Sequence, residues 1–257
     1  MKYIDIHCQI NFDDFDLDRD EVIARSREKG VGMIVIGTNL DESKKAVKLA
    51  EENPDIWAIV GLHPTEVANE VFDYEAYKKL AVHPRTVGIG ECGLDYYRAE
   101  HATKALQQEV FEKHIALANE VKKPLMLHLR SGVQEGQNAY KDTLEVIKKH
   151  SQVHGDVHFY AGSLDEAHEF IRLGFRLSFT GVITFARNYD EIIKAIPLNM
   201  IMSETDAPYV TPAPYRGQRN EPSYVTEVAH KIAEIRGEPL DIVLPHLVDN
   251  ARKLFSI

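Results

Sequence analysis

The chain has 257 residues, of which 44% are hydrophobic, and its formal net charge is -10. A chain of this length is sufficient for one α/β barrel, so we expect residues 1–257 to form a single domain. The acidic balance argues against a protein that coats duplex DNA with a broad basic surface, although it allows a nucleic acid held in a local basic cleft or by bound cations.

The cysteine content, the hydropathy and the N-terminus indicate a cellular location. Two cysteines provide no disulfide framework, so we expect Cys8 and Cys92 to pack in the interior of a protein from a reducing compartment. The chain has no apolar run of the roughly 18–20 residues that a membrane span needs. Its N-terminus lacks the basic stretch and apolar stretch of a signal peptide. We therefore expect a soluble cytoplasmic protein without a membrane partner.

Short apolar runs alternate with charged, helix-like segments along the chain. The apolar runs cover residues 3–7, 32–37, 56–63, 86–91, 124–129, 156–162, 175–181 and 200–206. Segments with apolar residues at helical spacing lie between them, at 41–53, 103–121, 141–150 and 164–174. Continuous apolar strands that alternate with helices are typical of a parallel sheet covered by helices. Eight such units in about 250 residues predict a closed (β/α)8 TIM barrel.

An open, doubly wound sheet is the main alternative to this barrel. That fold favours a glycine-rich phosphate loop after its first strand. The first predicted strand is instead followed by HCQINFDDF (7–15), which contains no glycine. The sequence therefore favours the barrel over a dinucleotide-binding sheet.

Polar side chains with useful chemistry close most of the predicted strands. They are His7, Gln9, His63, Glu91, His128, Arg130, His158, Glu204 and Asp206. The carboxyl ends of all strands in a parallel barrel meet at one rim, so these distant residues converge there. Each one alone has a structural explanation, such as a packing histidine, a helix cap or a turn before proline. Together they predict a cation site, because buried ionisable groups are costly unless they are paired or bind metal.

The donor atoms of this set indicate which ions it binds. Imidazole nitrogens and carboxylate oxygens suit Zn and Mn, and the carboxylates also admit Mg. The two oxygens of Glu91 allow it to bridge two ions, and two such ions can bind a phosphate ester and activate water. We therefore expect two divalent metal ions and a hydrolytic reaction.

Seven motifs contain or flank these residues: IDIHCQINF, GLHP, GIGECGLDYY, PLMLHLR, VHFYAGS, SETDAPYVTP and YRGQRNEP. In this order they resemble the motifs of the TatD-type metal-dependent deoxyribonucleases, a branch of the amidohydrolase-like barrels. The resemblance runs from residue 3 to about residue 255. It implies a (β/α)8 barrel that hydrolyses DNA phosphodiesters, in several members as an exonuclease.

The resemblance also implies roles for individual residues. The metal ligands are His7, Glu91, His128, His158 and Asp206, with Gln9 at a position where the family normally has histidine. Glu91 bridges the metals, and Asp206 is also the base for the attacking water, so these two are the catalytic candidates. The oxygen of Gln9 can still bind a metal, but an amide is a poorer ligand for zinc than imidazole. We therefore expect the ion at His7 and Asp206 to be weakened or to be a harder ion such as Mg or Mn.

Further candidates surround the predicted centre. The substrate-binding candidates are His63, Arg130, Arg216 and Arg219, and those that hold metal ligands in place are Asp95 and Glu204. The forked guanidinium group of arginine suits phosphate, and Arg216 and Arg219 lie on a loop where a phosphate clamp is useful.

Three functions are compatible with these features. We expect a metal-dependent hydrolase of DNA phosphodiesters, acting on single strands or accessible ends. An amide or ester hydrolase of a small molecule on the same barrel is the second possibility. The third is a binding protein whose catalysis is weakened by Gln9.

Overall fold

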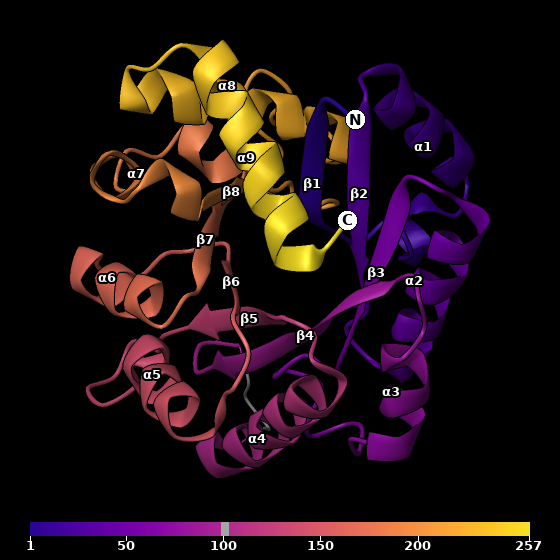
Figure 1. Ribbon diagram of the computed structural model, residues 1–257, viewed down its shortest axis with the longest axis vertical. Helices are drawn as coiled ribbons and strands as arrows, with labels where there is room; N and C mark the ends of the chain where they lie inside the picture. Colours follow the sequence, from indigo (N-terminus) through magenta and orange to yellow (C-terminus); the bar gives the residue numbers. More distant parts are fainter. Residues whose placement is uncertain (99–102) are drawn as a thin grey trace.

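Parallel strands form a barrel surrounded by helices in the computed structural model, which describes residues 1–98 and 103–257 (Figure 1). Within these residues one sheet has eight strands in the order β1 to β8, and each adjacent pair is parallel. The strands are β1 (Tyr3–Cys8), β2 (Val31–Ile36), β3 (Ile56–Val60), β4 (Thr86–Asp95), β5 (Leu125–Arg130), β6 (Gly155–His158), β7 (Arg176–Phe179) and β8 (Ile201–Ser203).

Helices follow most of the strands and cover the outside of the barrel. The α-helices are α1 (Arg19–Glu28), α2 (Leu40–Glu52), α3 (Tyr74–Ala81), α4 (Lys104–Val121), α5 (Ala139–His150), α6 (Leu164–Arg172), α7 (Asp190–Ala195), α8 (Val225–Arg236) and α9 (Leu240–Phe255). Short 3-10 helices are η1 (Asp13–Phe15), η2 (Gly181–Thr184), η3 (Leu198–Met200) and η4 (Pro222–Tyr224). Among the described residues, no helix is both long and apolar enough to cross a membrane.

The barrel closes where the chain beyond β8 meets the end of β1. Cys8 forms a parallel bridge with Ala207. The N–H of Asp206 donates to the carbonyl of His7 at 2.9 Å, and the N–H of Gln9 donates to the carbonyl of Ala207 at 2.8 Å. The predicted (β/α)8 barrel is therefore confirmed, and the loops after β1 and β8 are neighbours at its rim.

Helix α6 shows how local sequence sets an element. Ser163 caps its N-terminus by accepting from the N–H of Glu166, while the Glu166 carboxylate accepts from the N–H of Ser163. Ala167 and Phe170 are buried on its inner face. The helix ends shortly before Gly174, which adopts a φ of +82°, a conformation that suits glycine just after a helix.

Three predicted runs, 56–63, 156–162 and 175–181, extend beyond β3, β6 and β7, so His63 lies after its strand. Two further differences concern β4 and β8. Strand β4 continues to Asp95, so Glu91 lies inside the strand rather than at its end. The pairing of β4 with β5 shifts register between Ile89 and Cys92, which places Glu91 at an irregular point of the strand. Strand β8 ends at Ser203, so Asp206 lies in the following loop, where the chain turns to meet β1. The burial of Cys8 and Cys92 as free thiols is as predicted.

Candidate metal centre

Glycines allow Glu91 to point into the barrel. Gly90 adopts a φ of +146°, and a Cβ atom on it would lie 2.3 Å from the carbonyl oxygen of Met126 on β5. A Cβ atom on Gly61, after β3, would lie 2.5 Å from the backbone of Gly90. The close approach of these three backbone segments therefore requires glycine at both positions. It places the carboxylate of Glu91, which is 2% exposed, among the histidines of other strands.

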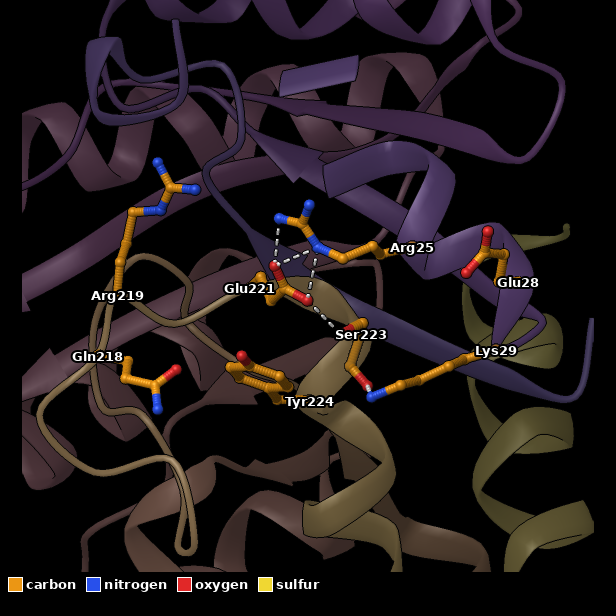
Figure 2. Close-up of a pocket in the computed structure, with 8 residues that line it drawn as sticks. All are labelled: Arg25, Glu28, Lys29, Gln218, Arg219, Glu221, Ser223 and Tyr224. Carbon is orange, nitrogen blue, oxygen red and sulfur yellow. Dashed lines mark hydrogen bonds and ion pairs between the residues drawn. The ribbon is translucent and has the colours of Figure 1, made fainter. Parts of the chain in front are cut away.

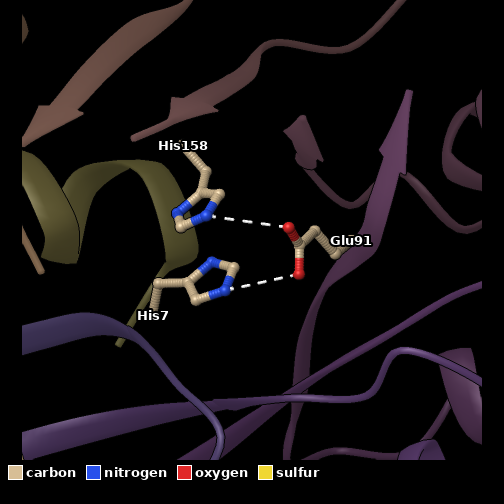
Figure 3. Close-up of side chains that lie close together, drawn as sticks. All are labelled: His7, Glu91 and His158. Carbon is tan, nitrogen blue, oxygen red and sulfur yellow. Dashed lines mark ion pairs between the residues drawn. The ribbon is translucent and has the colours of Figure 1, made fainter. Parts of the chain in front are cut away.

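The first group around this carboxylate consists of His7, Glu91 and His158 (Figure 3). Nε2 of His7 lies 3.4 Å from Oε2 of Glu91, and Nε2 of His158 lies 3.6 Å from Oε1. The two imidazole rings stack with their centroids 3.5 Å apart. Oδ1 of Asp206 lies 3.7 Å from Nε2 of His7 and 3.9 Å from Nε2 of His158. Four side chains thus direct donor atoms toward one small region.

The second group consists of His63, Glu91 and His128. Nε2 of His63 lies 3.4 Å from Oε1 of Glu91, and Nδ1 of His128 lies 2.7 Å from the same oxygen. In each group the donor atoms lie within 4.8 Å of one another. Glu91 belongs to both groups, so one carboxylate lies between two pairs of histidines. The sequence interpretation placed His63 at the substrate, whereas the geometry places it among the possible metal donors.

Polar side chains lie beside the outer nitrogens of three of the histidines. Oε1 of Glu204 lies 3.0 Å from Nδ1 of His158, and Oδ2 of Asp95 lies 3.1 Å from Nε2 of His128. Oγ1 of Thr65 lies 2.7 Å from Nδ1 of His63. For His158 and His128 the nitrogen that faces away from the centre lies beside a carboxylate, which leaves the other nitrogen to bind a cation. Nδ1 of His63 instead accepts from the N–H of Thr65 at 3.2 Å, so the neutral ring carries its proton on Nε2. Asp95 and Glu204 thus lie beside His128 and His158, and their supporting role stays a prediction.

The loop after β8 brings Asp206 to the centre. Asp206 has a φ of +57°, a conformation that is uncommon outside glycine, asparagine and aspartate. The preceding residue, Thr205, donates its N–H to Oδ1 of Asp5 at 2.9 Å and its hydroxyl to Oδ2 at 2.5 Å. Asp5 is fully buried in β1, so the first strand determines the path of the loop that carries Asp206.

The carboxylates and imidazoles perturb one another strongly. Burial lowers the pKa of His7, but Glu91, Glu204 and Asp206 outweigh this effect and raise it to about 9. Burial raises the pKa of Glu91, yet His63, His7 and His128 together hold it well below its usual range. The surrounding histidines therefore favour the ionised form of Glu91. A metal ion that binds here must displace protons from the imidazole rings.

Asp206 differs from Glu91 in its protonation. Burial raises the pKa of its carboxyl to about 6, although His158 and His7 oppose this effect. Burial and His128 lower the pKa of His63, which favours a neutral imidazole there. A carboxylate whose pKa lies near neutrality is suited to accept a proton in a reaction.

Unpartnered polar atoms test whether these residues fit a metal ion. Among the described residues, Nε2 of His7 and Oε1 of Gln9 are buried and have no hydrogen-bond partner. Nε2 of Gln9 instead donates to Oε2 of Glu91 at 3.4 Å. Buried polar atoms without partners are uncommon, and a cation beside Glu91 would satisfy both atoms. The donor set therefore fits divalent metal binding, with the amide of Gln9 facing the same carboxylate.

A cavity of about 390 Å³ opens above the two groups. Its lining residues are Gln9, Phe12, Thr38, His63, Thr65, Glu66, Glu91, Asp95, Arg98, His128, Arg130, His158, Phe159, Asp206, Tyr209 and Val210. Two of the predicted substrate-binding residues, His63 and Arg130, are among them. The sequence interpretation missed Arg98 and Tyr209, although both follow predicted metal-site motifs directly, in GLDYYR (93–98) and TDAPY (205–209).

The structure does not bring Arg216 and Arg219 to this cavity. The guanidinium group of Arg219 pairs with Asp18 at 2.6 Å and lies over the ring of Phe15. Arg216 donates to the carbonyl of Thr211 at 2.9 Å. Because both side chains are engaged with their own surroundings, the predicted phosphate clamp is not assembled at the metal centre.

A second cavity, of about 590 Å³, lies between α1 and the loop that leads to η4 (Figure 2). Its polar groups largely satisfy one another. Arg25 donates to Glu221 at 2.7 Å through Nη2, and the hydroxyl of Ser223 donates to the same carboxylate at 2.5 Å. No histidine is among the described residues that line it. Although this cavity is larger than the one above Glu91, its lining does not form a metal centre.

A parallel barrel with histidines and carboxylates gathered at one rim defines a metal-dependent hydrolase of the amidohydrolase-like type. Within that class, the chain belongs to the TatD family, because the family model described as TatD related DNase matches residues 4–256.

Individual relatives agree with this assignment. The uncharacterized metal-dependent hydrolase YabD of Bacillus subtilis is 37% identical, with 98% of each chain covered. The 3'-5' ssDNA/RNA exonuclease TatD of a Rahnella species is 34% identical, also with 98% of each chain covered. The crystal structure of YjjV, a TatD homologue from Escherichia coli, superposes with a TM-score of 0.90 at 28% identity, covering 100% of this chain and 98% of that one.

Proposed function

We propose that this chain is a nuclease that removes nucleotides from the accessible end of single-stranded DNA with the help of two divalent cations. The observation that carries the proposal is the position of Glu91 between the pair His7 and His158 and the pair His63 and His128. A carboxylate shared by two imidazole-rich sites suits a two-metal centre for phosphoester cleavage. The exonuclease activity named for the Rahnella relative supports the same class of substrate.

The donors divide into two sets. One ion would be held by His7, His158, Asp206 and Glu91, and the other by His63, His128 and Glu91. When bound, such ions polarise a phosphoryl oxygen and lower the pKa of water. The oxygen donors of the first set, with the amide of Gln9 beside them, favour Mg or Mn over Zn there.

The chain's own groups have separate tasks in this proposal. Asp206 accepts the proton of the attacking water, because its Oδ1 faces the first cation site beside His7 and His158. Arg130 lines the cavity and holds a phosphate through its forked donors. Glu91 keeps its negative charge between the two cation sites and thereby fixes both.

The dimensions and charge of the site favour a single strand. A cavity of about 390 Å³ is at the small end of the range for ligand sites, roughly 300–1,000 Å³, so it suits one nucleotide better than a duplex. The chain has a net charge of -10, so substrate phosphates must be met by cations in the centre and by a few arginines. A free or frayed end satisfies both conditions. The buried free thiols of Cys8 and Cys92 support a reducing, cytoplasmic location.

The test is metal-supported release of labelled nucleotides from a single-stranded oligonucleotide. We expect activity in the native chain with Mg or Mn and its loss in Glu91→Gln, whereas the surface variant Glu145→Gln serves as a matched control. A native chain inert with Mg, Mn, Co and Zn, beside an active Gln9→His variant, would indicate that Gln9 has weakened the centre. A chain inert on DNA that hydrolyses a small amide or ester would overturn the proposed substrate.

A further inference from the structure

The mouth of the cavity has two chemically different sides. Phe12, Tyr209 and Val210 line it on the loops after β1 and β8, whereas Arg98 lines it on the turn after β4 and Arg130 at the end of β5. Strands β4 and β8 are four positions apart in a closed ring of eight, so the loops after them face each other across the mouth. Tyr209 therefore lies opposite Arg98 and Phe12 opposite Arg130, while Phe159, just after β6, also lines the cavity.

Tyr209 is an exposed ring on a firmly held backbone. Tyr209 is 52% exposed. Its N–H donates to the carbonyl of Asp206 at 2.8 Å, and its carbonyl accepts from Nδ2 of Asn220 at 2.5 Å. The same short segment therefore positions Asp206 at the centre and the tyrosine ring at the mouth.

Two exposed aromatic rings near this end of the barrel, Tyr97 and Phe185, are covered by arginines. Arg130 lies 4.3 Å from the ring centroid of Tyr97, and Arg216 lies 4.1 Å from that of Phe185. No ring or cation stacks on Tyr209 among the residues that the structure describes. The ring of Tyr209 is thus available to a ligand in a way that the ring of Tyr97 is not.

We propose that Tyr209 stacks on the base of the terminal nucleotide while Arg98 and Arg130 receive phosphates on the opposite side. This inference rests on the proposed nuclease function and deepens it. With the base on one side and phosphates on the other, the scissile linkage lies above Glu91 and Asp206. Every base has a π face, so Tyr209 selects for an unpaired end without selecting a particular sequence.

The test measures stacking without turnover. The probe is an octathymidylate with 2-aminopurine at its 3' end and a phosphorothioate at the terminal linkage, because 2-aminopurine loses fluorescence when it stacks. We expect quenching with the native chain and Mg, and with Tyr209→Phe, which keeps the ring. Tyr209→Ala should bind the probe roughly tenfold to hundredfold more weakly, the range for loss of one base–aromatic stack, and without quenching. Tyr224→Ala, in the second cavity, is the matched control, and thermal unfolding verifies that each variant is folded.

The outcomes separate this inference from the proposed function. A bound probe that stays fluorescent with the native chain, or equal quenching with Tyr209→Ala, overturns the stacking role even if the unmodified strand is cleaved. Quenching that depends on Tyr209, without cleavage of the unmodified strand by any divalent ion, supports the binding role and overturns the nuclease proposal. An absence of both binding and cleavage overturns both.

Discussion

Glu204 holds His158 from the side that faces away from the metal centre. Its Oε1 lies 3.0 Å from Nδ1 of His158 and accepts a hydrogen bond of 2.7 Å from the N–H of Phe159. Nε2 of the same ring is thereby directed at Glu91. A carboxylate behind a metal-binding histidine fixes both the tautomer and the direction of the ring.

Replacing this carboxylate should weaken the centre although Glu204 belongs to neither group of donor residues. We expect Glu204→Gln to lower the affinity for Mn roughly 10–100-fold, the usual cost of losing such a partner. Isothermal titration calorimetry of the metal-free protein measures this affinity directly. Glu145→Gln should leave it unchanged. Equal affinities in the native chain and in Glu204→Gln would show that His158 is oriented by other contacts.

Gln9 offers an experiment on metal preference. In Gln9→His, imidazole replaces the neutral amide beside Glu91, and imidazole is the better ligand for Zn. We expect the ratio of Zn affinity to Mg affinity to rise by at least tenfold. Competition between the two ions, followed by calorimetry, measures this ratio without any assay of activity. An unchanged ratio would mean that residue 9 does not contact the ion.

The barrel could be predicted from the sequence because its signal is repeated. The strands are short and mostly buried, and eight of them alternate with helical segments, so an error in one run does not change the topology. The ends of the elements were less predictable. Glu91 and Asp206 occupy irregular backbone, one beside Gly90 and the other at positive φ, and tertiary contacts rather than local preference determine such conformations.

The centre was predictable to the extent that strand ends define it. His7, His128 and His158 converge because the topology requires it. Strand topology does not predict the direction of long side chains on loops. Arg219 lies on the expected loop, yet its guanidinium group pairs with Asp18. Nothing in the spacing of that loop indicates this partner, which lies about 200 residues away in the sequence.

His114 should make stability depend on pH independently of the metal centre. It is fully buried in α4, where Nε2 accepts from the N–H of Leu62 at 2.9 Å and Nδ1 lies 2.8 Å from the carbonyl of Val110. The N–H of Leu62 must donate, so the ring is neutral, and burial lowers its pKa from 6.5 to about 4. The unfolded chain therefore binds a proton more readily than the folded chain between these values.

The sign of this effect follows from that difference. The stabilising contribution of neutral His114 is present above pH 6.5 and is lost as the pH falls toward 4, by an amount on the order of 3 kcal/mol. Urea unfolding of the metal-free protein across this interval measures the slope. We expect a smaller slope in His114→Gln than in the native chain, and an unchanged slope in the exposed control His246→Gln. Identical slopes in all three proteins would contradict the assignment.

Gly90 connects the packing of the barrel with the position of Glu91. A methyl group there meets the carbonyl of Met126 at 2.3 Å, and the φ of +146° already disfavours any other residue. We expect Gly90→Ala to lower the free energy of unfolding by about 3 kcal/mol or more, because strain and overpacking combine. The matched control is Gly217→Ala, where φ is +88° but nothing lies within 4 Å, so backbone strain alone should cost about 1–2 kcal/mol. Urea unfolding gives both values, and Mn titration should show a loss of affinity only in Gly90→Ala. Equal costs with intact metal binding would mean that β4 and β5 can separate without moving Glu91.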